Sequence, residues 1–272
     1  MLSLYDPSLL IMNKILLMAG REIKGVAFDL EGTVVNLEPL HFAAHVETAK
    51  NIGVELNLDD PRTLTELVPN IIGGPPRTIM EQIIALKYTG KPIAGEDLEK
   101  MIQQMLDEDR EIYLNLRQSA GEVPPREGFL EVLQDLRRRE LPVTIGSYTS
   151  EEDATEIFRI SGLDKLFDRK SIILKEDVKN IKPNPEVYLK TARMMGIDPK
   201  EQLVFEDSPL GTKAGAGAGS IVIGMPVFDN LLTRQALKDS GANLIFGSWN
   251  EVSLELRRSK EGNPSLSKEG TL

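Results

Sequence analysis

Two pairs of acidic residues stand out because each follows a short apolar run. Asp29 and Glu31 follow the run 25–28, and Glu206 and Asp207 follow the run 203–205. Short apolar runs of this kind are typical of buried strands, and an open parallel sheet binds its ligands beyond the carboxyl ends of its strands. We therefore expect both acidic pairs at one edge of a sheet.

The two pairs suit different parts of one reaction. An ionised Asp29 can act as a nucleophile or as a ligand of a hard cation, and Glu31 can carry a proton for a leaving group. Glu206 and Asp207 can complete, with Asp29, a set of oxygen ligands for Mg²⁺. Taken alone, the first pair is equally compatible with a strand that ends in an acidic turn, because such short patterns recur by chance.

A hydroxyl and a cation complete the candidate site. Ser147 follows the apolar run 143–146, and its hydroxyl and the neighbouring amides can hold a phosphoryl oxygen. Lys182 lies in the segment Ile181-Lys182-Pro183-Asn184-Pro185, whose prolines favour an extended chain. A single lysine is usually a solvated surface residue. Its place between two acidic strand ends favours a role in the site.

The hydrophobic pattern divides the elements that position these residues into two groups. Helical periodicity with apolar residues at 40–46, 64–67, 79–86 and 98–116 predicts a helical block directly after the first strand, placed over the strand ends like a lid. From Gly121 onward, helix and strand alternate, which predicts an α/β fold with a Rossmann-like parallel sheet covered on both faces. The expected helices are 128–139, 150–160, 185–195, 211–218 and 231–239, and the expected strands are 143–146, 171–174, 203–205, 221–223 and 244–246.

These patterns predict the domain organisation. We expect an N-terminal extension at 1–20, an α/β core at 21–39 and 121–258, an inserted α-helical cap domain at 40–120, and a disordered tail at 259–272. The extension is too short and too interrupted by polar residues to span a bilayer, and it lacks the features of a signal peptide. An amphipathic helix that binds a partner is the alternative for this segment.

Composition restricts the partners. The chain has 272 residues, of which 41% are hydrophobic and 27% charged, as expected for a soluble globular protein. Its net charge of -10 argues against nucleic acid or an anionic membrane as a partner, because no basic stripe offsets the repulsion. The chain has no cysteine, which excludes disulfides and thiolate sites and fits a cytoplasmic location.

Taken together and in order, the motifs resemble those of a known superfamily. The four segments are Asp29-Leu30-Glu31-Gly32-Thr33, Ser147, Lys182-Pro183-Asn184-Pro185 and Glu206-Asp207-Ser208. They are similar to the four motifs of the haloacid dehalogenase-like hydrolases, and the inserted helical block resembles the cap of the β-phosphoglucomutase and phosphoglycolate phosphatase branch. The resemblance covers residues 23–252, and four ordered motifs are far more specific than one.

The resemblance implies a role for each motif. Asp29 would be the nucleophile that forms an aspartyl-phosphate, and Ser147 and Lys182 would hold the phosphoryl group. Mg²⁺ would be bound by Asp29, the backbone carbonyl of Glu31 and Asp207, with Glu206 as an additional or outer ligand. The cation and Lys182 would offset the repulsion between a carboxylate nucleophile and a phosphate anion.

Glu31 departs from the superfamily's usual pattern, which has a second aspartate at this position. The longer side chain moves the oxygen that carries the proton, and proton transfer of this kind is worth ~10²–10⁴ in rate. The enolase-phosphatase branch is similar in having Asp-x-Glu-Gly-Thr, which implies that glutamate can serve. Catalysis is the leading interpretation, and a slow or non-catalytic phospho-acceptor is the alternative from another class.

Residues of the helical block provide further candidates. The segment Gly74-Pro75-Pro76-Arg77 resembles a substrate-facing segment of the same branch, so Arg77 is a candidate for binding a phosphate or carboxylate; a surface arginine is the alternative. His41 and His45 have a spacing that can bind zinc, but no third ligand is evident. His41 resembles a residue often found near the cap hinge.

The sequence thus predicts a Mg²⁺-dependent phosphatase that acts on a small phosphorylated metabolite, of the sugar phosphate or phosphoglycolate type. A phosphomutase of the β-phosphoglucomutase kind is the alternative, because it uses the same machinery and returns the phosphoryl group to a sugar. We expect a monomer or a small homo-oligomer.

Overall fold

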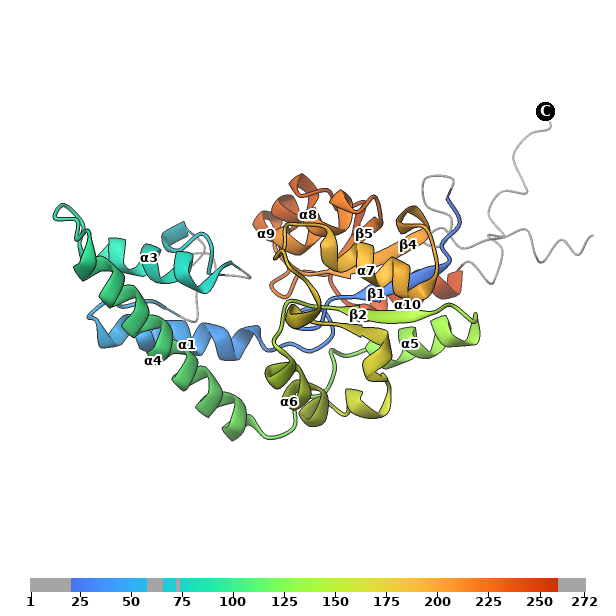
Figure 1. The fold of residues 1–272 in the computed structure, drawn as a ribbon, viewed down its shortest axis with the longest axis horizontal. Helices are drawn as coiled ribbons and strands as arrows, with labels where there is room; N and C mark the ends of the chain where they lie inside the picture. The colour runs from blue at the N-terminus through green and yellow to red at the C-terminus, as the bar shows by residue number, and fades with distance from the viewer. Residues whose placement is uncertain (1–20, 58–65, 72–73, 259–272) are drawn as a thin grey trace, which may run out of the picture.

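A six-stranded parallel sheet forms the centre of the larger part of the molecule (Figure 1). The computed structural model describes residues 21–57, 66–71 and 74–258, so the predicted extension, the predicted tail and Leu64 lie outside the described residues. The strand order is β3-β2-β1-β4-β5-β6. The strands are β1 (Gly25–Phe28), β2 (Val143–Gly146), β3 (Ile172–Ile173), β4 (Gln202–Glu206), β5 (Ile221–Gly224) and β6 (Leu244–Ile245).

The order of the strands places a crevice at the end of β1. From β1 the chain adds β2 and β3 on one side, and β4, β5 and β6 on the other, so β1 is the point at which the strand order reverses. In the register of the sheet, Phe28 pairs with Ile145 of β2 and with Phe205 of β4. The residues that follow these three strands therefore begin at the same level.

Helices cover both faces of the sheet, as the sequence predicted. On one face α5 (Phe129–Arg138), α6 (Glu151–Ser161) and α10 (Trp249–Arg258) pack on the apolar side chains of the central strands. On the other face α7 (Glu186–Met195) and α8 (Pro209–Gly217) do so, with α9 (Leu231–Asp239) beside α8. Short 3-10 turns at Leu163–Lys165, Arg169–Ser171, Lys175–Asp177 and Pro199–Glu201 join these elements. The predicted α/β class is confirmed.

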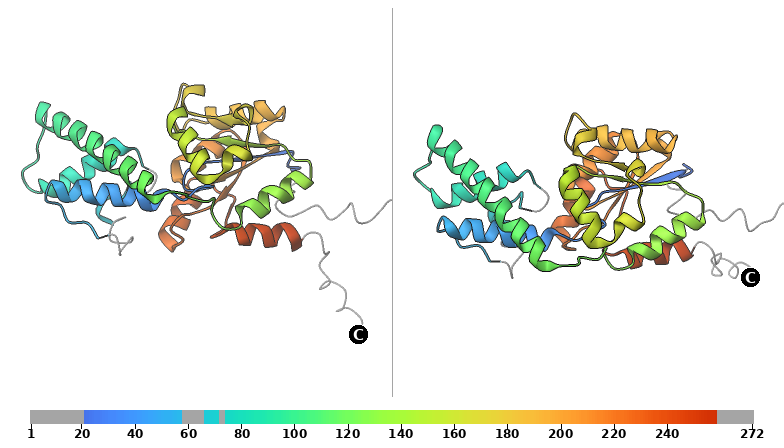
Figure 2. Two further views of the ribbon diagram at one scale, coloured as in Figure 1. Left: turned by 90° about the horizontal axis from the view of Figure 1, so that it is seen from below. Right: turned by 60° about the horizontal axis from the view of Figure 1, so that its bottom comes forward.

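The helices inserted between β1 and α5 form a separate lobe with its own apolar core (Figures 1 and 2). They are α1 (Glu38–Asn51), α3 (Pro76–Lys87) and α4 (Glu96–Ala120). Their buried side chains include Phe42, Met80, Ile83 and Met105, which contact one another and are not part of the sheet's core. Among the described residues, every helix is too short or too polar to cross a bilayer.

The helix α10 was not predicted from the sequence. Its side chains Trp249, Val252 and Leu256 are buried at helical spacing against the sheet, but the segment is short and follows a strand closely. The Trp249 ring lies 5.7 Å from that of Phe28, and its Nε1 donates a hydrogen bond of 3.1 Å to the carbonyl of Thr33. This helix therefore supports the loop that follows β1.

Candidate active site

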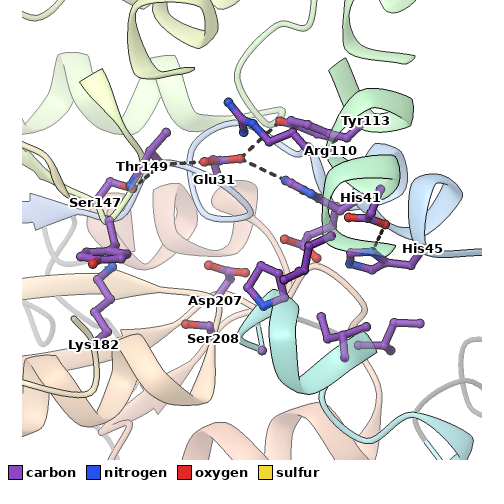
Figure 3. Close-up of a pocket in the computed structure, with 18 of the residues that line it drawn as sticks. Glu31, His41, His45, Arg110, Tyr113, Ser147, Thr149, Lys182, Asp207 and Ser208 are labelled. Carbon is purple, nitrogen blue, oxygen red and sulfur yellow. Dashed lines mark hydrogen bonds and ion pairs between the residues drawn. The ribbon is translucent and has the colours of Figure 1, made fainter. Parts of the chain in front are cut away.

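A pocket of about 790 Å³ lies where the helical lobe meets the carboxyl ends of β1, β2 and β4 (Figure 3). Five predicted site residues line it, namely Asp29, Glu31, Ser147, Lys182 and Asp207. Residues of α1, α3 and α4 form the opposite wall. The sheet edge and the lobe thus share one cavity.

Lys182 joins the two acidic strand ends. Its Nζ donates hydrogen bonds to Asp29 Oδ1 at 2.5 Å and to Glu206 Oε1 at 2.6 Å. Burial raises the pKa of Asp29 to about 8, an effect that Lys182 opposes and Glu206 strengthens. Burial alone lowers the pKa of Lys182, but the two carboxylates outweigh it and raise that pKa. The lysine therefore remains charged.

The side chains of Asp29, Glu206 and Asp207 form a buried cluster, with one carboxylate oxygen of each within 4.8 Å of the others. The Thr33 hydroxyl donates to Asp207 Oδ1 at 2.9 Å. Burial, followed by the charges of Asp29, Glu206 and Glu38, raises the pKa of Asp207 well above its usual range. An all-oxygen donor set fits Mg²⁺, and a bound dication would offset this repulsion. The residues present therefore fit the metal that the sequence predicts.

Two glycines leave space for these carboxylates. Gly32 has a φ of 78°, and a Cβ at this position would lie 2.1 Å from Asp207 Oδ2. A Cβ on Gly211 would lie 1.8 Å from Glu206 Oε1. Any larger residue at either position would displace a carboxylate of the cluster.

Glu206 is fully buried and its carboxylate is held by hydrogen-bond donors of the protein. Oε1 accepts from Lys182 and, at 2.6 Å, from the hydroxyl of Tyr188; Oε2 accepts from the hydroxyl of Ser208 at 3.1 Å. Tyr188 on α7 was missed by the sequence analysis, because a tyrosine in a helix that packs on a sheet carries no signal of its own. These contacts favour Glu206 as the residue that positions Lys182.

Glu31 extends toward the helical lobe, as Figure 3 shows. Oε1 accepts a hydrogen bond of 2.6 Å from the Thr149 hydroxyl, and Oε2 lies 3.2 Å from His41 Nε2 and 3.5 Å from the Tyr113 hydroxyl. Burial raises the pKa of Glu31, but His41 and Thr149 outweigh burial and lower it. Burial likewise lowers the pKa of His41, and Glu31 outweighs burial and raises it. The contact therefore favours the charged form of both groups.

The Ser147 side chain is buried at the end of β2 beside Thr149. The two hydroxyl oxygens lie 2.8 Å apart, and the Thr149 N–H donates to Ser147 Oγ at 3.3 Å. The Ser147 N–H donates to the carbonyl of Ile173 on β3. Ser147 and Glu31 are thus linked through one threonine, which the sequence analysis did not single out.

Arg77 does not line the pocket. Its guanidinium is half exposed and binds Glu99 at 2.7 Å and Glu81 at 2.9 Å. Arg110 of α4 lines the pocket instead, and its guanidinium lies 2.9 Å from Asp153 on α6. The structure therefore brings Arg110, and not Arg77, to the wall of the cavity.

The two histidines bind different carboxylates. His41 contacts Glu31, whereas His45 Nδ1 lies 2.6 Å from Asp109 Oδ1. Within the described part of the chain, neither belongs to the cluster of groups able to hold a metal ion.

Comparison with known proteins gives the same family as the motifs. The sequence model described as "haloacid dehalogenase-like hydrolase" matches residues 23–219. The phosphorylated carbohydrates phosphatase of Thermotoga maritima is 27% identical over 220 residues, 81% of this chain and 92% of that protein. The fructose-1-phosphate phosphatase of Escherichia coli is 26% identical over 198 residues, 72% of this chain and 92% of that protein.

Among solved structures, a putative β-phosphoglucomutase from Thermotoga maritima has a TM-score of 0.60 and 24% identity. The match covers 87% of this chain and 99% of that chain, and it shows a common fold. The family model and the two relatives agree with the superfamily predicted from the four motifs. This chain belongs to the haloacid dehalogenase-like hydrolases.

Proposed function

We propose that the protein is a Mg²⁺-dependent phosphatase that hydrolyses a small phosphorylated metabolite through an aspartyl-phosphate on Asp29. The observation that carries this proposal is the pair of short contacts from Lys182 to Asp29 and Glu206, beside Asp207, at the floor of the pocket. The names of the two relatives, both phosphatases of phosphorylated sugars, support a sugar phosphate as the substrate type.

In the first step, Asp29 attacks phosphorus in its ionised form, which the charge of Lys182 favours and a bound dication would favour further. The bond between phosphorus and the ester oxygen breaks. Lys182 and the Ser147 hydroxyl bind the phosphoryl oxygens. The proton of the His41 imidazolium passes to Glu31 across their 3.2 Å contact, and Glu31 gives it to the leaving oxygen, which returns Glu31 to the carboxylate that the second step needs. Asp29, Asp207 and the Glu31 carbonyl would hold Mg²⁺, with Glu206 as an outer ligand. The ion would neutralise the negative charge of the transferring group.

In the second step, water attacks the phosphorus of the aspartyl-phosphate, and the bond between phosphorus and the Asp29 oxygen breaks. Glu31 takes a proton from the attacking water, and inorganic phosphate leaves. The helical lobe would act as the cap, because its helices form the opposite wall of the pocket and closure would exclude water from the first step.

Phosphate release from a panel of sugar phosphates, phosphoglycolate and an aryl phosphate, with Mg²⁺ or with EDTA, tests the proposal. We expect release that requires Mg²⁺, is abolished by Asp29→Asn, and is unchanged by Asp239→Asn, which alters an exposed aspartate on α9. Transfer of the phosphoryl group to a second sugar would indicate a phosphomutase instead. A phosphoryl group that persists on Asp29 without turnover would overturn hydrolysis in favour of a phospho-acceptor.

A further inference from the structure

Glu38, the first residue of α1, lies in the wall of the pocket and has no hydrogen-bond or ion-pair partner among the described residues. It is 7% exposed and lines the same cavity as Asp29 and Asp207. Within the described residues, no hydrogen bond or ion pair reaches its carboxylate. Buried carboxylates are normally paired, because an unpaired one loses its hydration without compensation.

The potential donors around Glu38 are already engaged. Burial raises the pKa of Glu38, and the nearby His41 and His45 favour its charged form against burial. His41 itself binds Glu31 and His45 binds Asp109. The carboxylate oxygens of Glu38 are therefore available to accept hydrogen bonds from a molecule that enters the pocket. A favourable interaction with the N-terminus of α1 explains an acidic residue at this position, but an exposed carboxylate would serve that purpose equally well.

Glu38 lies on the side of the pocket where the leaving group would extend, and not where the phosphoryl group would bind. Phosphoryl oxygens lie at Lys182 and Ser147 in the proposed reaction, and the rest of the substrate extends from there toward the lobe. Glu38 is a residue of the lobe that reaches the same cavity, and its charge acts on Asp207 at the floor. It is absent from the cluster of possible metal ligands in the described part of the chain.

We propose that Glu38 accepts hydrogen bonds from hydroxyl groups of the leaving group, and that it selects neutral polyhydroxylated monophosphates. A carboxylate is an acceptor only, so an apolar leaving group leaves it buried without a donor. A second phosphate or a carboxylate on the substrate is repelled. This inference rests on the proposed phosphatase function and narrows its substrate from sugar phosphate or phosphoglycolate to the former.

The arginines near the lobe support the same selectivity. A substrate with a second anionic group needs a free cation on the lobe side of the pocket. Arg77 is bound to Glu81 and Glu99 and does not line the cavity, and Arg110 is bound to Asp153. Each of these guanidinium groups thus already has a carboxylate partner.

A matched set of substrates tests the inference. Hexyl phosphate, sorbitol 6-phosphate and 6-phosphogluconate have the same chain length and differ in hydroxyl and carboxylate groups. We expect the native protein to prefer sorbitol 6-phosphate, and Glu38→Gln to lower kcat/KM for this substrate about tenfold, as for a lost hydrogen bond to a charged group. The value for hexyl phosphate should change less than about twofold. Glu47→Gln, which removes the same charge from the exposed face of α1, is the control.

The phosphonate analogues of the three compounds cannot be hydrolysed, and their binding is measured by calorimetry with Mg²⁺ present. The inference is supported if the phosphonates bind in the same order of affinity as the substrates are preferred, and if Glu38→Gln loses this order. This holds even if no substrate is turned over, because then only the proposed reaction fails. An equal loss for all three compounds in Glu38→Gln would show a structural role and overturn the inference. Preference of the native protein for 6-phosphogluconate or its phosphonate would overturn it as well.

Discussion

Lys182 Nζ lies 2.5 Å from Oδ1 of Asp29, the carboxylate that we propose as the nucleophile. The same ammonium group reaches Glu206 on β4, so one side chain neutralises two strand ends that are distant in sequence. Glu206 is in turn fixed by Tyr188 and Ser208. The position of the cation is thus determined by the packing of α7 against the sheet.

Replacement of Lys182 by methionine should reduce both activity and stability. The change leaves Asp29 and Glu206 buried without their counter-charge, which typically costs about 3–5 kcal/mol in the free energy of unfolding. Turnover should fall by at least about 10³-fold, because the transferring oxygens lose their cation. Chemical denaturation in EDTA and initial rates with Mg²⁺ measure the two effects. The exposed pair Lys24–Glu201 provides the control Lys24→Met, and an equal loss of stability in both variants would contradict the prediction.

Replacement of Gly32 by alanine should disrupt the metal cluster. The new Cβ would lie 2.1 Å from Asp207 Oδ2 and would also impose strain at a φ of 78°. Gly90 has a φ of 81° with nothing within 4 Å, so Gly90→Ala carries the strain without the clash. We expect Gly90→Ala to cost about 1–2 kcal/mol in stability. Gly32→Ala should cost more and, unlike Gly90→Ala, should lose the rise in melting temperature on addition of Mg²⁺. A retained response to Mg²⁺ in Gly32→Ala would count against the cluster as the metal site.

Glu31→Gln should slow the reaction according to the leaving group. An alkoxide needs a proton on departure, whereas p-nitrophenolate does not, so the loss should reach about 10²–10⁴-fold for a sugar phosphate and be much smaller for p-nitrophenyl phosphate. The first step is isolated by measuring the burst of released alcohol or phenol. Thr149→Val, which removes a hydrogen bond to Glu31 but no carboxylate, is the comparison variant. Equal losses for both substrates would contradict a proton-transfer role.

The ion contacts between lobe and core should give a stability that depends on pH. Burial opposes ionisation of Asp153, but hydrogen bonds from Ser150, Arg117 and Arg110 outweigh it and lower the pKa of Asp153. The folded-state pKa lies below the unfolded value of about 3.9, so this contribution is fully present above that pH and lost as the pH falls through the folded pKa.

Asp153→Asn should therefore reduce the free energy of unfolding by about 2 kcal/mol at neutral pH, between the values for exposed and buried ion pairs. The difference from the native protein should shrink below about pH 4. Denaturation at several pH values measures it, with Asp239→Asn as the control for an exposed aspartate. A difference that stays constant down to the acid transition would show that packing, not charge, is lost.

Much of the fold and part of the site could be predicted from the sequence, because local patterns carry them. The apolar run 25–28 and the alternation after Gly121 predict parallel strands, and parallel strands bring Asp29, Ser147 and Asp207 to one edge. The helix expected at 150–160 is α6, and Ser150 caps it, since its side chain accepts from the N–H of Asp153. The short helix α10 was missed because its burial depends on the aromatic cluster around Trp249, which only the assembled sheet creates.

The amino-acid sequence by itself determined the order of the motifs, the parallel sheet, the inserted helices and the family. Only the tertiary structure decided the direction of each side chain within the pocket. Glu31 turns to Thr149, which is 118 positions away, and Arg77 to the glutamates of its own lobe, while Glu38 meets no donor among the described residues. The physical reason is that hydrogen bonds and ion pairs form between groups that packing brings together, and the spacing of residues along a chain does not specify these distances.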